Sequence, residues 1–221
     1  MNNKIRVVPA ILTDKPAELE RMLKLSAAFT HYVQIDIMDG QFVPSTSISW
    51  EDIERARPRL RWEVHLMVKD PARVLLSYQR AGAFRAIFHF EAAGDPESVI
   101  ASARALGLEV GLAINPETAV PQVLQLLDRL DSILVMSVHP GFYGAKFLPE
   151  VLSKVREIKA ARPRLEVGID GGIKESNILE AASSGLDAIC VGSAIFLQSD
   201  PAASYRRLQS LAEGASKTPL Q

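Results

Sequence analysis

The chain is poor in the features that mark several large classes of protein. It has one cysteine, Cys190, in 221 residues, which excludes an intrachain disulfide framework and a zinc site built from cysteines. The formal net charge is -1, so the charge balance indicates neither a nucleic-acid surface nor a polybasic membrane anchor. The first residues, MNNKIRVVPAIL, hold no long apolar stretch, and no signal peptide or transmembrane span is predicted anywhere. We therefore expect a cytoplasmic protein that binds neither nucleic acid nor membrane.

The composition that is present is that of a folded soluble protein. Hydrophobic residues make up 48% of the chain and charged residues 23%, which argues against disorder. No stretch has the composition of a linker. We expect one domain over residues 1–221, with a short polar tail from about residue 214.

Short apolar runs alternate with amphipathic segments along the whole chain. Most of the runs lack in–out alternation, which is typical of strands in a buried parallel sheet. Apolar residues at helical spacing in Pro16–Ala28 and Pro149–Ala160 predict helices between strands. The predicted strands are Arg6–Leu12, Tyr32–Ile37, Arg61–Met67, Ala86–Phe90, Val110–Ile114, Ser132–Val138, Leu165–Ile169 and Ala188–Val191.

This alternation predicts an α/β protein with a (β/α)8 barrel, a TIM barrel. An open doubly wound sheet is the alternative. It is the weaker interpretation because no glycine-rich nucleotide-binding turn follows the first strand.

Polar side chains recur where the predicted strands end, which is where (β/α)8 barrels carry their active sites. Gln34, Asp36 and Met38 share one face of the second strand, because side chains alternate along a strand. His65 and Met67 share a face of the third strand in the same way. The fourth strand ends in His89 and Glu91, and the seventh ends in Asp170. A single aspartate at a strand end is usually a turn or helix-capping residue, so only the recurrence of polar residues at several strand ends indicates an active site.

Glycines follow the last three strands and favour an anion site. A segment with Gly141 and Gly144 follows the sixth strand, Gly171-Gly172 follows the seventh, and Gly192-Ser193 follows the eighth. Exposed backbone N–H groups at such turns bind phosphate in many barrels. The sequence therefore predicts a phosphorylated small-molecule substrate.

The sequence resembles the ribulose-phosphate 3-epimerase family. The matching segments are VVPAIL, IDIMDGQFVP, VHLMV, SVHPGFYGAKFLPEVLSKVREI, IDGGI and VGSAIF, in order from residue 7 to residue 196. The resemblance thus covers nearly the whole chain. Allulose-phosphate epimerases share much of this pattern, which leaves pentose and hexose phosphates open as substrates.

The resemblance implies roles for particular residues. Asp36 and Asp170 match the two aspartates that act as acid and base on opposite faces of the sugar, and with His65 they match three of four metal ligands. The implied metal is Mg, Mn, Zn or Fe. Met38, Met67 and Met136 match methionines around the reacting carbon. The segments that match the family's phosphate site contain Gly141, Gly144, Gly171, Gly172, Gly192 and Ser193.

The sequence departs from the family pattern within the site itself. Gln34 stands where the family has its fourth metal ligand, a histidine, so the metal is expected to bind weakly, to be Mg or Mn, or to be absent. Ala10 replaces a serine that contacts substrate. Gln41, Ser45 and Tyr143 also differ from the family residues.

Three hypotheses follow. The first is an isomerase of the pentose phosphate pathway, which inverts carbon 3 of D-ribulose 5-phosphate to give D-xylulose 5-phosphate through an enediolate. The second is another phosphosugar barrel enzyme, such as an allulose-6-phosphate epimerase, a decarboxylase or an aldolase. The third is a non-catalytic sugar-phosphate binder, which the changes at Ala10 and Gln34 keep open. The family forms homo-oligomers, and the resemblance implies the same here.

Overall fold

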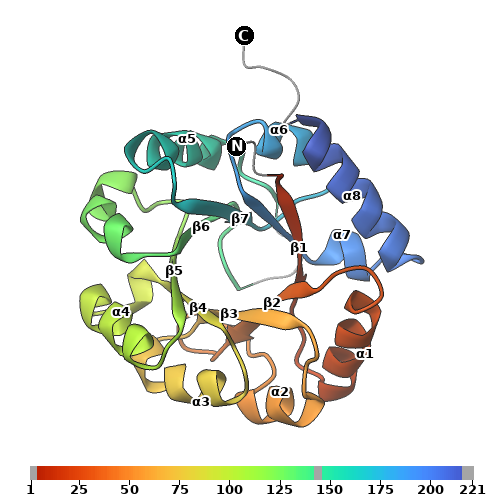
Figure 1. The fold of residues 1–221 in the computed structure, drawn as a ribbon, viewed down its shortest axis with the longest axis horizontal. Coiled ribbons are helices and arrows are strands. Elements are labelled where there is room, and N and C mark those ends of the chain that lie inside the picture. Colours follow the sequence, from red (N-terminus) through yellow and green to blue (C-terminus); the bar gives the residue numbers. More distant parts are fainter. Residues whose placement is uncertain (1–3, 142–145, 216–221) are drawn as a thin grey trace.

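Eight parallel strands close into a barrel in the order β1 to β8. The computed structural model describes residues 4–141 and 146–215. Figure 1 shows the ring of strands with the helices around its outside. The strands are β1 (Arg6–Ile11), β2 (Tyr32–Met38), β3 (Arg61–Met67), β4 (Arg85–His89), β5 (Glu109–Ile114), β6 (Ser132–Met136), β7 (Glu166–Asp170) and β8 (Ala188–Val191). The predicted (β/α)8 barrel is confirmed.

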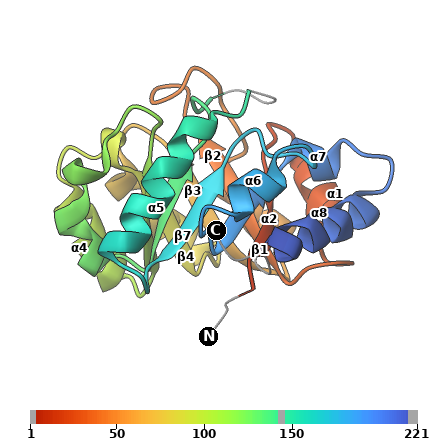
Figure 2. The same ribbon diagram turned by 90° about the horizontal axis from the view of Figure 1, so that it is seen from above.

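Helices connect the strands and run along the outside of the barrel, as the side view in Figure 2 shows. They are α1 (Pro16–Ser26), α2 (Trp50–Ala56), α3 (Leu75–Arg80), α4 (Pro96–Ala105), α5 (Leu152–Ala161), α6 (Ile178–Ala182), α7 (Ser193–Phe196) and α8 (Pro201–Ala215). Between β5 and β6 the connection is made of two 3₁₀ segments, Val120–Gln122 and Leu124–Arg129. Shorter 3₁₀ turns occupy Pro71–Arg73, Phe90–Ala92 and Pro149–Val151. None of the described helices is long and apolar enough to cross a membrane.

Alternating strand residues build two separate cores. Val7 and Ile11 of β1 face outward into the large apolar layer between the strands and the helices. Val8 and Ala10 face inward and join a smaller apolar cluster inside the barrel. The inside is tight at Gly111, where a Cβ atom would lie 2.7 Å from side-chain atoms of both Ile87 and Ser132. The polar residues at strand ends therefore stand on a close-packed floor.

The amino end of the barrel interior is closed by a charged network around Arg85. The Arg85 guanidinium donates to Glu63 at 3.2 Å, to Glu166 at 2.7 Å and to Glu109 at 2.7 Å. The hydroxyl of Tyr32 also donates to Glu63, at 2.5 Å. Because the side chain of Arg85 is only 7% exposed, its charge depends on these carboxylates for compensation. This network seals the end opposite the predicted site.

Candidate functional site

Strand register brings the predicted site residues to one place. Asp36 of β2 pairs with His65 of β3, and Met38 pairs with Met67 two residues nearer the carboxyl end. On the other side of the barrel mouth, Asp170 is the last residue of β7. β1 and β8 lie between β2 and β7 in the closed sheet, so curvature of the barrel carries Asp170 toward Asp36.

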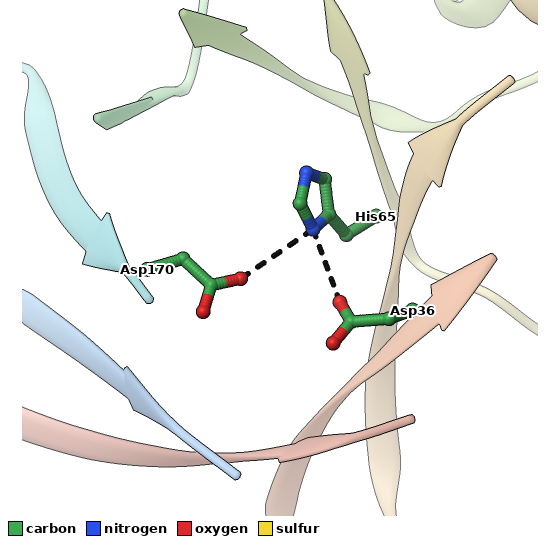
Figure 3. A group of neighbouring side chains, drawn as sticks. All are labelled: Asp36, His65 and Asp170. Atoms are coloured by element: carbon green, nitrogen blue, oxygen red, sulfur yellow. Dashed lines mark hydrogen bonds and ion pairs between the residues drawn. The ribbon is translucent and has the colours of Figure 1, made fainter. Parts of the chain in front are cut away.

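Asp36, His65 and Asp170 form a compact cluster, shown in Figure 3. His65 Nδ1 lies 3.0 Å from an oxygen of Asp36 and 3.5 Å from an oxygen of Asp170. The imidazole is completely buried, and the two carboxylates are 9% and 13% exposed. Two acids thus face one nitrogen in a site that is nearly closed to water.

Gln34 lies beneath this cluster and links the two acids. Its amide nitrogen donates to Asp36 at 2.9 Å and to Asp170 at 2.7 Å. Its amide oxygen accepts from the thiol of Cys190 at 3.2 Å. Cys190 is buried, and its thiol fixes which end of the Gln34 amide faces the acids.

The surroundings of the cluster raise the pKa of both Asp36 and His65. Burial raises the pKa of Asp36, and the nearby charge of Asp170 adds to the rise, against hydrogen bonds from His65 and Gln34. Burial alone would lower the pKa of His65, but hydrogen bonds and charges of Asp170 and Asp36 outweigh it and raise the pKa to about 9. The two acids thus favour the protonated, positively charged form of His65.

A second histidine continues the cluster toward the rim. His65 Nε2 lies 3.0 Å from Nε2 of His89, and the two rings stack. His89 Nδ1 lies 3.4 Å from an oxygen of Glu91. Burial lowers the pKa of His89 to about 4, although Glu91 stands beside it. His89 and Glu91 are visible in the sequence as polar residues at a strand end, but nothing there links them to His65.

One cavity collects nearly all of the predicted site residues. It opens over the cluster and is floored by β-strand residues and walled by the turns after β6, β7 and β8. The predicted residues that line it are Asp36, Met38, His65, Met67, Met136, Gly141, Asp170, Gly171, Gly172, Gly192 and Ser193. Gln34 touches the acids from below and is not part of the lining. Gly144 and Tyr143 lie outside the described residues.

The turn after β7 forms the glycine wall of this cavity. Gly171 has φ +116°, and a Cβ atom there would lie 2.4 Å from Val138, so the turn has room for glycine alone. The hydroxyl of Ser137 donates to the carbonyl oxygens of Asp170 and Gly171, at 3.0 and 2.6 Å. The wall is therefore fixed, directly beside the acid, to the residue that follows β6.

The remaining departures from the family pattern have different structural settings. Ala10 lines the cavity and presents a methyl group where the resemblance implies a serine hydroxyl. The hydroxyl of Ser45 donates to the carbonyl of Gly141 at 2.7 Å, which ties the segment after β2 to the turn after β6. The side chain of Gln41 is exposed at the rim.

Comparison with known proteins agrees with this geometry. The family model described as the ribulose-phosphate 3 epimerase family matches residues 6–196. The chain belongs to the ribulose-phosphate 3-epimerase family. Within this family, a ribulose-phosphate 3-epimerase of Mycobacterium bovis is 38% identical over 218 residues, covering 95% of this chain and 94% of the relative. The cytoplasmic isoform of ribulose-phosphate 3-epimerase from Oryza sativa subsp. japonica is 35% identical over 220 residues, covering 95% of each chain.

Solved structures outside the epimerase family share the fold. The crystal structure of 3-hexulose-6-phosphate synthase from Salmonella typhimurium aligns with a TM-score of 0.70 and 17% identity, covering 94% of this chain and 98% of that one. Orotidine 5'-phosphate decarboxylase from Pyrococcus horikoshii aligns with a TM-score of 0.67 and 15% identity, covering 93% and 98%. At these identities the likeness concerns the barrel alone.

The donor set suits the divalent cation that the epimerase family implies. One atom each from Asp36, His65 and Asp170 lies within 4.8 Å of the others, and two carboxylate oxygens with one imidazole nitrogen suit Mg, Mn, Zn or Fe. Gln34 does not complete the set as it stands, because it turns its N–H groups toward the acids. Rotating the amide by half a turn would present its oxygen instead. The chain thus offers three metal ligands, and the metal's identity stays a prediction.

Proposed function

We propose that the protein interconverts D-ribulose 5-phosphate and D-xylulose 5-phosphate by inverting carbon 3. The observation that carries this proposal is the placement of two carboxylates, Asp36 and Asp170, from different strands on one cavity, with His65 between them. The epimerase relatives, similar over nearly the full chain, support it. The protein is thereby an isomerase that acts on a carbohydrate.

The two aspartates carry out the proton transfers. The proton on carbon 3 lies next to a carbonyl, so its removal gives an enediolate. One aspartate removes this proton, and the other returns a proton to the opposite face of the same carbon. Burial helps the acid that accepts the proton, because it raises the pKa of Asp36 toward the working range.

Charge at the cavity has to be balanced as the enediolate forms. A divalent cation held by Asp36, His65 and Asp170 would supply Lewis-acid stabilisation of the negative substrate oxygens. Three buried methionines on the cavity wall, Met38, Met67 and Met136, exclude water from the reacting carbon. Low water content strengthens each electrostatic contact there.

The glycine turns hold the substrate phosphate away from the reacting carbon. Gly171 and Gly172 form one wall of the cavity, and Gly192 and Ser193 form the neighbouring wall, together with Gly141. Backbone N–H groups exposed at such turns bind anions, and glycine lets the phosphate approach closely. Binding energy at the phosphate orients the sugar between the acids. Gly144 is part of the same proposal from the sequence.

The proposal extends to organisation and location. We propose that the chain is a single domain with a cytoplasmic location and a homo-oligomeric state. Gln209 of α8 accepts from the N–H of Val7 at 2.8 Å and donates to the carbonyl of Ile5 at 2.7 Å, which ties the last helix to the first strand. One relative is described as a cytoplasmic isoform.

A solvent-exchange assay tests the chemistry directly. Purified protein is incubated with D-ribulose 5-phosphate in deuterated water, and the products are followed by NMR and by a coupled assay for D-xylulose 5-phosphate. We expect inversion with one deuterium incorporated at carbon 3. Chelation followed by Mg, Mn, Zn or Fe identifies the metal. Absence of both inversion and exchange under every metal would reject the proposal, and faster turnover of allulose 6-phosphate would move it to a hexose substrate.

A further inference from the structure

The geometry beside His65 points to a role for two residues to which the proposed mechanism gives none. We propose that Glu91, acting through His89, holds a proton on Nε2 of His65, so that Nδ1 is the nitrogen that offers a lone pair toward Asp36 and Asp170. Glu91 and His89 are then positioning residues for the metal ligand. This inference rests on the proposed function only in taking His65 as that ligand.

Glu91 is surrounded by hydrogen-bond donors. One of its oxygens accepts the backbone N–H of Asn115 at 2.8 Å and the hydroxyl of Thr118. These hydrogen bonds, with that of His89, outweigh burial and hold the pKa of Glu91 below its usual value. The carboxylate is therefore charged and only accepts hydrogen bonds. Its other oxygen, 3.4 Å from His89 Nδ1, requires the hydrogen to be on that nitrogen.

The loop that holds Glu91 is itself fixed in place. The ammonium group of Lys154, on α5, donates to the carbonyl oxygens of Asn115, Pro116 and Thr118 at 3.0, 2.6 and 2.7 Å. The loop therefore cannot rotate its donors away from Glu91 without breaking these bonds. The carboxylate at the start of the chain of hydrogen bonds has one orientation.

The next step is the contact between the two imidazoles. His65 Nε2 and His89 Nε2 are 3.0 Å apart, which requires one hydrogen between them. Because the hydrogen of His89 is on its Nδ1, its Nε2 is bare and accepts. His65 must then donate from Nε2. Both rings are fully buried, so no water can replace either partner.

The consequence appears at the other nitrogen of His65. With the proton on Nε2, Nδ1 presents a lone pair toward two carboxylates at 3.0 and 3.5 Å. A lone pair and two negative oxygens attract a cation, which is either a proton or a divalent metal. The hydrogen bonds from Glu91 to His65 thus prepare this nitrogen as a ligand before any metal binds.

Two variants interrupt the series of hydrogen bonds from Glu91 to His65 at different points. Glu91→Gln places an amide where a carboxylate stood, and its oxygen is needed by the N–H of Asn115, so an N–H group turns toward His89. His89→Phe keeps a flat ring against Phe42 but removes the acceptor for His65. His89→Gln restores an acceptor and serves as the conservative rescue. Glu97→Gln, at a carboxylate 61% exposed on α4, is the matched control.

The readouts are ring-nitrogen NMR of His65 and calorimetric titration with Zn²⁺. In the unaltered protein and in Glu97→Gln, we expect the Nε2 hydrogen of His65 with and without Zn²⁺, and a zinc-dependent shift at Nδ1 alone. In Glu91→Gln and His89→Phe we expect that hydrogen to be lost from Nε2 and zinc affinity to fall about 10–100-fold, with recovery in His89→Gln. An unchanged Nε2 hydrogen and zinc affinity within about twofold of wild type in both variants would overturn the inference. If the expected shifts occur in a protein without epimerase activity, the proposed function fails while the positioning role stands.

Discussion

The two ends of the barrel interior treat buried carboxylates in different ways. At the amino end, Glu63 faces the guanidinium of Arg85, a cation that cannot lose its charge at any ordinary pH. At the carboxyl end, Asp36 and Asp170 face the amide of Gln34 and the imidazole of His65. In the first arrangement, the negative charge of the carboxylate is compensated at every ordinary pH. The second leaves negative charge for a partner that arrives and departs, which is what a catalytic site needs and a structural plug does not.

The largest expected effect is a loss of activity on substitution at the carboxyl end of the barrel interior. Asp36→Asn and Asp170→Asn each remove one group of the proton-transfer pair, and turnover is expected to fall by about 10³-fold or more. The free energy of unfolding should change little, because relief of the repulsion between the two acids is offset by the loss of a favourable contact with His65. Steady-state kinetics and urea denaturation measure both quantities.

The matched control for the two aspartates is Asp70→Asn, at a carboxylate 50% exposed that pairs with Arg73 on the surface. It should leave turnover unchanged. Full activity in either site variant would contradict the two-carboxylate scheme.

The second-largest expected effect is a loss of stability, with little change in activity, on substitution at the amino end of the barrel interior. Arg85→Met leaves Glu63 buried without its cation, and the free energy of unfolding is expected to drop by about 3–5 kcal/mol. Among the molecules that stay folded, kcat should change little, because the cavity lies at the other end of the barrel. Urea denaturation and active-site-normalised kinetics test this. Arg73→Met, at a side chain 83% exposed, gives the background for losing an arginine.

The third effect is a pH dependence confined to the carboxyl end. The pKa of His65 in the folded protein is about 9, above the value of about 6.5 for an unfolded histidine. Its contribution to stability is therefore complete below about pH 6.5 and is lost as the pH rises through about 9. In metal-free protein we expect a loss of about 3 kcal/mol over this window that is absent from His65→Gln. Identical pH profiles for the two proteins, from urea denaturation in chelator, would contradict the prediction.

The smallest effect concerns the side chain that joins the acids. Gln34→His replaces an amide by an imidazole at the position of the family's fourth ligand, and affinity for Zn²⁺ is expected to rise about tenfold, or about 1.4 kcal/mol. Gln34→Leu offers no ligand atom and should show no such gain. Calorimetric titration compares the three proteins. Equal affinities for the histidine and leucine variants would show that position 34 does not reach the metal.

The strands and much of the site could be predicted from the sequence because both follow from short-range rules. Continuous apolar runs mark strands buried on both sides, and β3 and β8 have the predicted limits. Side-chain alternation placed Gln34 and Asp36 on one face, where the structure has them in contact. These features need no knowledge of which strands are neighbours.

Other features depend on closure of the barrel and could not be predicted. The Arg85 network joins residues from β3, β4, β5 and β7, whose approach is set by the closed sheet. The link from His65 to Glu91 depends on distances between ring nitrogens. The position of Gln34 predicts a weak metal ligand. The sequence does not show that the thiol of Cys190 donates to the amide oxygen of Gln34, which leaves the N–H groups facing the two acids.

The turn at Gly171 has a consequence for redesign of the cavity. A side chain at this position would meet Val138 at 2.4 Å, so enlarging residue 171 would displace the neighbouring strand end together with the acid beside it. The wall contributed by β2 and β3 carries unbranched thioethers, Met38 and Met67, which accommodate new shapes by bond rotation. Attempts to broaden substrate scope should therefore alter the sulfur-lined wall and leave the glycine wall intact.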